Sequence, residues 1–502
     1  MKNRIKLISK FILFLFILFS CVILVEKVLE PEYYYNDEWP TTATYQNFYK
    51  LEKDSVDVLF LGSSHCASAF NPQLLYDNYG ITSYNLGCEQ QSMVVSYYWL
   101  KEALKTQSPK AVVIDSYMLF MYESGEHEYN NLNCAEAAVR KAVDPMHLSM
   151  NKVNLARDIE EIDPSQSAKS FIFKNIRFHS RWYELGENDF TSLKMESHNA
   201  IKGFSPMSAK NPGADFEPFC DGETSEVEQM VPTMTSYFEK IVSLCKEENI
   251  ELILTCIPAI TDIYKYNATK SLADSLDVPY YDYNEAKIYN AIEYDVKEYS
   301  HGHPNIWGAE KITNYIGDIL KNQYGIKPQT DISFDLSREE YERIKYNCEL
   351  INITDPVEYL NKLKNENYVL FIYGRGGIAE IDDTNIYDLV EDLGTNFSLS
   401  QLFGDYYFGM VDEATKEYRN TTFGDTKFTD KGSFRDGLSR YEISNIIYAN
   451  GYQKTSFKID GIEAYSGEPG IHFIVYDKEN KRTIDVKRLY RDEEGIKLSG
   501  ML

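Results

Sequence analysis

The chain has 502 residues, and its 77 Asp and Glu against 51 Lys and Arg give a formal net charge of −26 at pH 7. Nucleic-acid phosphates are bound by basic surfaces, so this charge argues against nucleic acid as a partner. The eight cysteines include no C-x-x-C pair or other spacing typical of a metal site. We interpret Cys66, Cys88 and Cys256, which lie in apolar contexts, as small core residues, and we predict neither a metal nor a cofactor.

The N-terminus predicts a membrane helix. Basic residues precede an uncharged apolar run over 11–25, and apolar residues among them extend it to the roughly 20 residues that a bilayer needs. Positive charge before the run predicts a cytoplasmic N-terminus and an extracellular remainder. A cleaved signal peptide is the first alternative, although no small-x-small site follows the run. A lipoprotein site at Cys21 is the second, and Phe19 argues against it. We expect residues 1–27 to hold a single-pass protein in the cell membrane.

Residues 51–325 alternate short apolar runs with longer helical patterns. Three of the runs are almost continuously apolar, as in parallel strands covered on both faces. This alternation predicts a doubly wound α/β fold with a parallel five-stranded sheet, whose ligands lie at the carboxyl ends of the strands. The predicted strands are Val56–Leu61, Ser83–Leu86, Ala111–Asp115, Ile250–Ile257 and Val278–Tyr281, and the predicted helices are Glu89–Lys105, Val231–Glu248 and Gly308–Lys321.

Composition divides the remainder of the chain. We predict a juxtamembrane linker over 28–50, an inserted helical and loop-rich cap over about 118–230, and a second linker over 326–350. Residues 351–502 are rich in strand and turn signals and predict a β-rich α+β domain. There, Tyr368–Tyr373 is a strand that leads into 374–377. Ser456–Ile459 and Gly470–Tyr476 are predicted hairpin arms, with a turn at 477–480.

Two distant stretches carry residues suited to acyl transfer. The first predicted strand leads into Gly62-Ser63-Ser64, a small-residue turn, and His303 lies just before a helix that Asn305 would cap. A serine hydroxyl becomes a nucleophile when a neighbouring imidazole takes its proton. Alone, however, Ser64 also fits a helix N-cap and His303 a surface loop. His301 raises a metal alternative, for which the sequence shows no further ligands.

Together these stretches resemble the SGNH (GDSL-like) hydrolase superfamily. The likeness is strongest to its membrane-anchored bacterial branch, which resembles the accessory acyltransferases of alginate acetylation and teichoic-acid D-alanylation. Gly62-Ser63-Ser64 corresponds to the first block, Gly87 to the second-block glycine and Ser300–Gly308 to the last block, over about 270 residues. The resemblance implies Ser64 as nucleophile, His303 as base, and the N–H groups of Ser64 and Gly87 as an oxyanion hole.

Two positions depart from the family pattern. Ser300 stands where the family has its acid, so Glu298 or Asp295 would orient His303, or the site would operate as a Ser–His dyad. A serine protease that loses this carboxylate loses about four orders of magnitude in rate. The third-block Asn is also missing, and Ser116 or Tyr117 would supply that oxyanion donor. These changes leave a catalytically weak or inactive relative as an alternative.

The C-terminal region is similar in the order of its motifs to the interleukin-like EMT-inducer domain. That resemblance implies a carbohydrate-binding module, and a packing domain without a ligand is the alternative. For the whole chain we expect a membrane-anchored serine esterase or O-acyltransferase acting on acyl esters, acetyl above all, of a cell-surface polysaccharide or other glycan. A membrane-bound O-acyltransferase is the expected protein partner. A non-catalytic glycan-binding or scaffold protein is the runner-up, and a lipase is the third interpretation.

Overall fold

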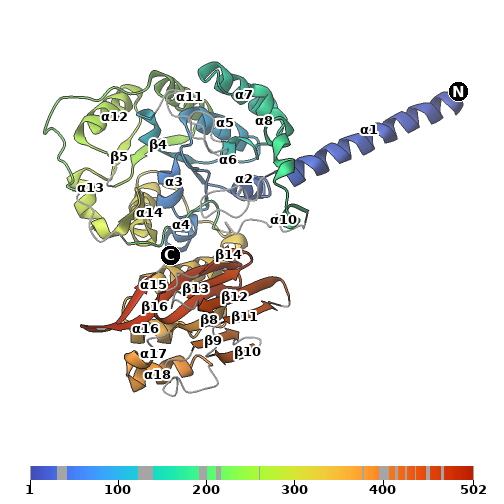
Figure 1. Ribbon diagram of the computed structural model, residues 1–502. Helices are drawn as coiled ribbons and strands as arrows, with labels where there is room; N and C mark the ends of the chain where they lie inside the picture. Colours follow the sequence, from blue (N-terminus) through green and yellow to red (C-terminus); the bar gives the residue numbers. More distant parts are fainter. Residues whose placement is uncertain are drawn as a thin grey trace. The chain divides into compact units, whose positions relative to one another are not determined.

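The computed structural model describes residues 2–30, 42–121, 140–190, 201–210, 216–258, 261–375, 378–394, 406–412, 417–423, 427–435, 437–447, 453–464 and 468–500. The chain forms two compact units, Met1–Arg343 and Ile344–Leu502 (Figure 1).

The N-terminal segment is one long helix, α1 (Lys2–Leu29). Its stretch Arg4–Leu29 has a mean hydropathy of 2.8, and the apolar side chains along it are exposed. At 1.5 Å per residue, its 26 residues span more than the roughly 30 Å of a bilayer's hydrocarbon core. Among the described residues this helix alone is long and apolar enough to cross a membrane, a property that signal sequences share.

The first unit is built on a five-stranded parallel sheet in the order β2-β1-β3-β4-β5. Each strand lies within two residues of its predicted bounds, so the predicted α/β class and strand set are confirmed. The strands are β1 (Val58–Leu61), β2 (Ser83–Asn85), β3 (Ala111–Asp115), β4 (Glu251–Cys256) and β5 (Tyr280–Asp282). Because β1 pairs with β2 on one side and β3 on the other, the sheet has its topological switch point at β1.

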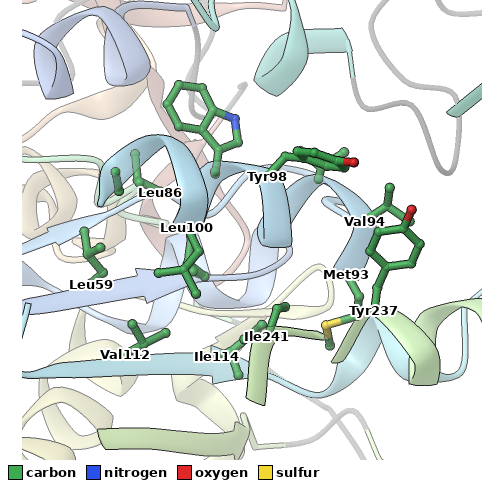
Figure 2. Close-up of a cluster of buried hydrophobic side chains, with 14 of the residues drawn as sticks. Leu59, Leu86, Met93, Val94, Tyr98, Leu100, Val112, Ile114, Tyr237 and Ile241 are labelled. Atoms are coloured by element: carbon green, nitrogen blue, oxygen red, sulfur yellow. The ribbon is translucent and has the colours of Figure 1, made fainter. Parts of the chain in front are cut away.

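Both faces of this sheet are covered, and alternate strand residues enter different cores. Leu59 and Val112 belong to a cluster with helices α2, α5 and α11, where Met93, Leu100 and Ile241 meet the sheet (Figure 2). Phe60 and Val113 belong to the opposite cluster. The helices are α2 (Thr42–Phe48), α3 (Ser64–Ala69), α4 (Pro72–Tyr79), α5 (Met93–Ala103), α11 (Pro232–Glu248), α12 (Ile263–Leu276), α13 (Ala286–Ala291) and α14 (Ile306–Asn322).

The predicted juxtamembrane linker over 28–50 contains a folded element. Helix α2 buries the rings of Tyr45 and Phe48 in the main core, where Tyr45 stacks on Trp99 at 4.6 Å. The sequence prediction treated this segment as a linker because the helix is too short to show a clear period. Its aromatic side chains make it part of the first unit.

The inserted region is helical where it is described. It contains the 3₁₀ helices η2 (Tyr117–Leu119) and η4 (His179–Tyr183), with α6 (Arg140–Val143), α7 (Met150–Ile162), α8 (Ala168–Ile172), α9 (Asn175–Phe178) and α10 (Glu187–Phe190). The Trp99 indole N–H donates to the Ala142 carbonyl at 2.9 Å, which ties the insert to α5.

The predicted linker over 326–350 is mostly helix. Helix α15 (Ile332–Asn352) runs through it, and the boundary between the compact units falls inside this helix. Before that boundary, Phe334 stacks on Tyr76 of α4 at 4.3 Å and Ser337 hydrogen-bonds to Gln73. The start of α15 is therefore packed on the first unit.

The second unit is β-rich, as predicted. A six-stranded antiparallel sheet has the order β10-β9-β8-β15-β16-β17, and a four-stranded sheet has the order β11-β12-β13-β14. The strands are β8 (Tyr368–Arg375), β9 (Tyr406–Asp412), β10 (Glu417–Phe423), β11 (Lys427–Phe434), β12 (Ser439–Ile447), β13 (Gln453–Ile459), β14 (Ile462–Glu463), β15 (Gly470–Asp477), β16 (Arg482–Asp492) and β17 (Gly495–Gly500). Its short helices are α16 (Pro356–Lys362), α17 (Ile378–Ile381) and α18 (Thr384–Glu391).

The predicted hairpin arms of this unit lie in different sheets. β13 pairs with β12 and β14, whereas β15 pairs with β8 and with β16 across the turn after Asp477. Aromatic side chains join the two sheets, since Phe371 of β8 contacts Tyr441 and Phe457 of the smaller sheet. Gly376 and Gly377, predicted to follow β8, lie outside the described residues.

Candidate active site

A short turn at the switch point of the sheet presents Ser64. Strand β1 ends at Leu61, Gly62 follows with φ +143°, and Ser63 is the N-cap of α3, its hydroxyl accepting from the His65 N–H at 3.2 Å. Ser64 is therefore the first residue of the helix and not its cap. Its hydroxyl is left for other contacts, and its N–H belongs to the first turn, where no intrahelical acceptor exists.

Asp115, at the carboxyl end of β3, holds this turn in place. Its carboxylate accepts from the Ser63 N–H at 2.5 Å, from the Ser63 hydroxyl at 3.1 Å and from the Tyr117 N–H at 3.0 Å. The side chain is buried, and that burial raises its pKa to about 6 even though these hydrogen bonds act in the opposite direction. The sequence interpretation had treated Asp115 only as the end of a strand.

Ser64 and His303 meet, although 239 positions separate them in the chain. The distance between Ser64 Oγ and His303 Nε2 is 2.8 Å, within the range of a hydrogen bond between nucleophile and base. This contact satisfies the geometric condition on which the sequence interpretation depended.

A tight hairpin delivers His303. Strands β6 (Tyr299–Ser300) and β7 (His303–Pro304) pair through Ser300 and His303, which leaves His301 and Gly302 as the two-residue loop. Their φ angles of +48° and +86° are those of a type I′ turn, which connects hairpin strands tightly. The turn directs the His301 carbonyl at His303, and its oxygen lies 2.9 Å from Nδ1.

This backbone contact determines the tautomer of His303. A carbonyl oxygen can only accept, so Nδ1 carries the proton and donates it to His301. Nε2 is then unprotonated and accepts from the Ser64 hydroxyl, which is the arrangement a general base requires. The carbonyl orients the ring as a carboxylate does in a serine-protease triad, but as a neutral dipole it stabilises the imidazolium less.

The loop that carries His303 is fixed on both sides. The Asn305 side chain accepts from the Trp307 and Gly308 N–H groups and so caps α14, as predicted. Its amide donates to the carbonyls of Ala209 and Lys297 at 3.1 and 3.0 Å. Ala209 lies in a strap over 201–210, part of the predicted cap.

The strap also contacts the elements around Ser64. The Ser205 N–H donates to the Ala67 carbonyl of α3 at 2.9 Å, and the Asn85 N–H donates to the Lys202 carbonyl at 2.9 Å. At Gly203, with φ +90°, an added Cβ would lie 1.7 Å from the Asn85 carbonyl oxygen. The strap therefore passes directly over the carboxyl end of β2, and sequence reasoning gave no sign of it.

A second histidine supports the ring of His303. The His65 ring lies 4.9 Å from that of His303 and packs edge-on against Tyr117 at 4.1 Å. Burial first, and the neighbouring His303 second, lower the pKa of His65 to about 3, so this ring stays neutral at ordinary pH. Among the described residues no group of three or more His, Cys, Asp and Glu side chains is arranged to hold a metal ion.

The predicted acids are engaged elsewhere. Glu298 pairs with Lys311 at 2.8 Å and accepts from the Asp295 N–H at 2.9 Å, while Asp295 caps the 3₁₀ helix η5 (Val296–Glu298). Both ring nitrogens of His303 face other groups, Ser64 and the His301 carbonyl. In this structure the site is a Ser–His dyad oriented by a backbone carbonyl.

The backbone N–H groups of two of the predicted oxyanion residues are also engaged elsewhere. The Gly87 N–H donates to Asn85 Oδ1 at 2.9 Å, and the Ser116 N–H donates to the Thr255 carbonyl at 2.8 Å. The prediction overlooked Asn85, whose side-chain oxygen lies two residues before Gly87 and accepts its N–H. The Ser64 N–H lies in the first turn of α3, where no intrahelical acceptor exists, so it remains the predicted oxyanion donor. One such donor is worth about 3 kcal/mol in a transition state.

Comparison with known proteins shows a distant structural likeness. The chain matches no protein-family model and no curated protein. Among solved structures it is similar to a GDSL-like lipase from Bacteroides thetaiotaomicron VPI-5482, with 12% sequence identity and a TM-score of 0.25. The likeness covers 56% of this chain and 99% of that one. At this identity and TM-score the likeness carries no argument about function.

Replacing Glu298 should have little effect on catalysis. In Glu298→Gln the side-chain oxygen still accepts from Asp295, and the lost partner is a partly exposed lysine, a pair worth about 0–1 kcal/mol. We expect kcat/KM for a chromogenic acetyl ester to stay within about threefold of the wild type. A fall of a hundredfold or more would show that Glu298 reaches His303 during turnover.

Ester hydrolysis should persist into mildly acidic solution. Burial lowers the pKa of His303, and its hydrogen bond to the His301 carbonyl only partly offsets this. The base acts in its neutral form, so activity is lost as pH falls through this lowered pKa, below the usual 6.5. Asp115, with its pKa of about 6, titrates in the same region. The midpoint of the acid limb of kcat/KM should therefore lie below pH 6.5, and a midpoint above it would contradict the assignment.

Proposed function

We propose that the protein is a membrane-anchored, extracytoplasmic serine esterase or O-acyltransferase that acts on acyl esters, acetyl above all, of a cell-surface glycan. The observation that supports this most directly is the 2.8 Å contact between Ser64 Oγ and His303 Nε2, with Nδ1 held by the His301 carbonyl. The resemblance of the Gly62–Ser64, Gly87 and Ser300–Gly308 blocks to the SGNH hydrolases supports the same reaction class.

The proposed chemistry proceeds through an acyl-enzyme. Ser64 Oγ attacks the acyl carbonyl while its proton moves to His303 Nε2, and the tetrahedral oxyanion faces the Ser64 N–H. Collapse breaks the bond to the leaving alcohol, which takes the proton from Nε2 and leaves the acyl group on Ser64. A sugar hydroxyl or water then gives its proton to Nε2 and attacks the ester, and Ser64 recovers its proton as the acyl group departs.

Contacts at the end of α1 support an anchor that is retained. Glu26 Oε1 accepts from the Lys174 N–H at 3.1 Å, and Glu30 pairs with the Lys174 ammonium at 2.7 Å. The Leu29 carbonyl accepts from Arg181, and the Leu29 side chain packs on Phe178. A cleaved signal peptide would take many of these partners away from the folded insert. We therefore propose a single-pass protein with a cytoplasmic N-terminus.

The tether favours transfer over simple hydrolysis. A catalyst held at the membrane can receive acyl groups from a membrane-bound O-acyltransferase, which would be its protein partner. The β-rich second unit would then bind the acceptor glycan.

A non-catalytic glycan-binding protein is the second candidate. The observation that favours it is the engagement of the Gly87 and Ser116 N–H groups and of the Glu298 carboxylate, which leaves the dyad with few transition-state donors.

Active-site labelling separates the two candidates. The full chain in detergent is treated with a fluorophosphonate probe, and peptide mass spectrometry locates the modified residue. The esterase proposal expects one label, on Ser64, that is lost in Ser64→Ala and kept in Ser243→Ala, a change at an exposed serine of α11. Absence of labelling together with absence of acetyl-ester turnover would reject the esterase in favour of the binder.

A further inference from the structure

The inserted helices α8–α10 carry an unusual surface. Outside α1, the large apolar side chains that are exposed in the described part of the first unit gather in this insert and at the start of α7. They are Leu148, Met150, Phe173, Ile176, Trp182, Tyr183 and Phe190, against Val227, Tyr264, Ile332 and Leu336 elsewhere. Trp182, Tyr183 and Phe190 are 63%, 82% and 68% exposed. Exposed aromatic residues gathered in this way mark an interaction site.

Several of these residues are neighbours in the chain of residues that hydrogen-bond to the end of α1. Phe173 precedes Lys174, which bonds both Glu26 and Glu30. Trp182 follows Arg181, which donates to the Leu29 carbonyl at 2.6 Å.

Phe190 extends the same pattern. It follows Asp189, which accepts from Arg181 at 3.0 Å. Helices α9, η4 and α10 all contact α1, and Figure 1 shows α10 near the end of α1 that is opposite the N-terminus. Phe173, Trp182 and Phe190 are thus each one residue from a side chain that takes part in the junction between α1 and the folded unit.

The length of α1 determines where this surface lies relative to the bilayer. The exposed apolar face of α1 continues to Val25, and the insert grips residues 26–30. At 1.5 Å per residue these last residues cover about 6 Å of helix axis. A bilayer has roughly 30 Å of hydrocarbon and 40–45 Å in all, so each headgroup layer is about 5–8 Å thick. If α1 fills the hydrocarbon, α9, η4 and α10 lie at the headgroups.

The chemistry of the surface fits that layer. Tryptophan and tyrosine are enriched at membrane–water interfaces, because their rings are apolar and their N–H and O–H groups still reach water. Trp182 and Tyr183 are neighbours with rings 5.1 Å apart, and Lys169 of the same insert is an exposed cation. Interfacial segments combine such aromatic and basic residues.

We propose that α8–α10 form a membrane-docking surface, which seats the first unit on the lipid headgroups beside its own transmembrane helix. The occupant is a phospholipid bilayer, and the inference rests on the proposed membrane anchor but not on the proposed esterase chemistry. Two attachments, the span and the docked insert, would fix the orientation of the unit, whereas a span followed by a flexible linker would leave it free to tumble.

Quenching by brominated lipid tests the proposal on the full chain. The protein is placed in nanodiscs of phosphatidylcholine with or without bromine on the acyl chains, and tryptophan emission is compared. Of the four tryptophans, Trp99 is buried, Trp307 is half-buried beside Asn305 and Trp39 lies outside the described residues. The bromine-quenched emission is the tryptophan emission that is lost when brominated lipid replaces ordinary lipid. Trp182→Phe should reduce this quantity by at least about one third, and Trp307→Phe, the matched control, should leave it unchanged.

Equal quenched emission in Trp182→Phe and wild type would overturn the docking surface. Failure of the chain to co-elute with the nanodiscs would overturn it as well, because it would remove the anchor. Fluorophosphonate labelling of the same samples reports the serine chemistry separately. Absence of both labelling and acetyl-ester turnover, with Trp182 quenching retained, would reject the esterase and support the docking surface.

Discussion

Replacing His303 with alanine should lower kcat/KM for an acetyl ester by about 10²–10⁴, and Ser64→Ala should do the same. Either change removes the proton transfer that the 2.8 Å contact provides. A complete triad loses on the order of 10⁶ when its serine or histidine is removed. Here a backbone carbonyl replaces the carboxylate at Nδ1, so the starting activity is lower and the fall is smaller.

The double variant makes this prediction specific. If Ser64 and His303 act as one unit, Ser64→Ala with His303→Ala should be no slower than either single variant. Steady-state kinetics on the four proteins measures this, with unfolding midpoints to show that all are folded. Independent, multiplying losses would mean that the two side chains act in separate steps and would reject the dyad.

The fold and the two reacting residues could be predicted because their signals are local. Continuous apolar runs such as Ala111–Asp115 mark parallel strands, and a small-residue turn after the first strand marks Ser64. The helix cap at Asn305 is also local, since its side chain accepts from the N–H groups two and three positions later, those of Trp307 and Gly308.

What sequence reasoning missed depends on contacts between distant segments. Nothing near Asp115 indicates that its carboxylate holds the turn at Ser63, 52 positions earlier. The sequence offered Glu298 or Asp295 as the group that orients His303, or no acid at all, because sequence motifs identify side chains and the group at Nδ1 is a backbone carbonyl. The His301-Gly302 pair could have pointed to it, since histidine and glycine can adopt the positive φ that both positions of a type I′ turn require.

Gly62→Ala should inactivate the protein and destabilise its first unit by about 2–5 kcal/mol. A Cβ at this position would lie 1.9 Å from Asp115 Oδ2 and 2.7 Å from its Cγ, so the carboxylate must leave the Ser63 N–H. Residue 62 also has φ +143°, a conformation that only glycine adopts without strain. Both effects act at the turn that positions Ser64, so ester turnover and the midpoint of urea unfolding should fall together.

Two other glycines separate the causes. Gly186→Ala adds a methyl group with no atom within 4 Å at an ordinary φ and should change neither measurement. Gly222→Ala is equally open but has φ +87°, so it reports backbone strain alone and should cost about 1 kcal/mol with activity intact. If Gly62→Ala behaved like Gly222→Ala, with turnover preserved, the contact between Asp115 and the turn would not be needed to position Ser64. That result would contradict the proposed dyad, because the 2.8 Å contact between Ser64 and His303 requires the end of β1 to stay in place.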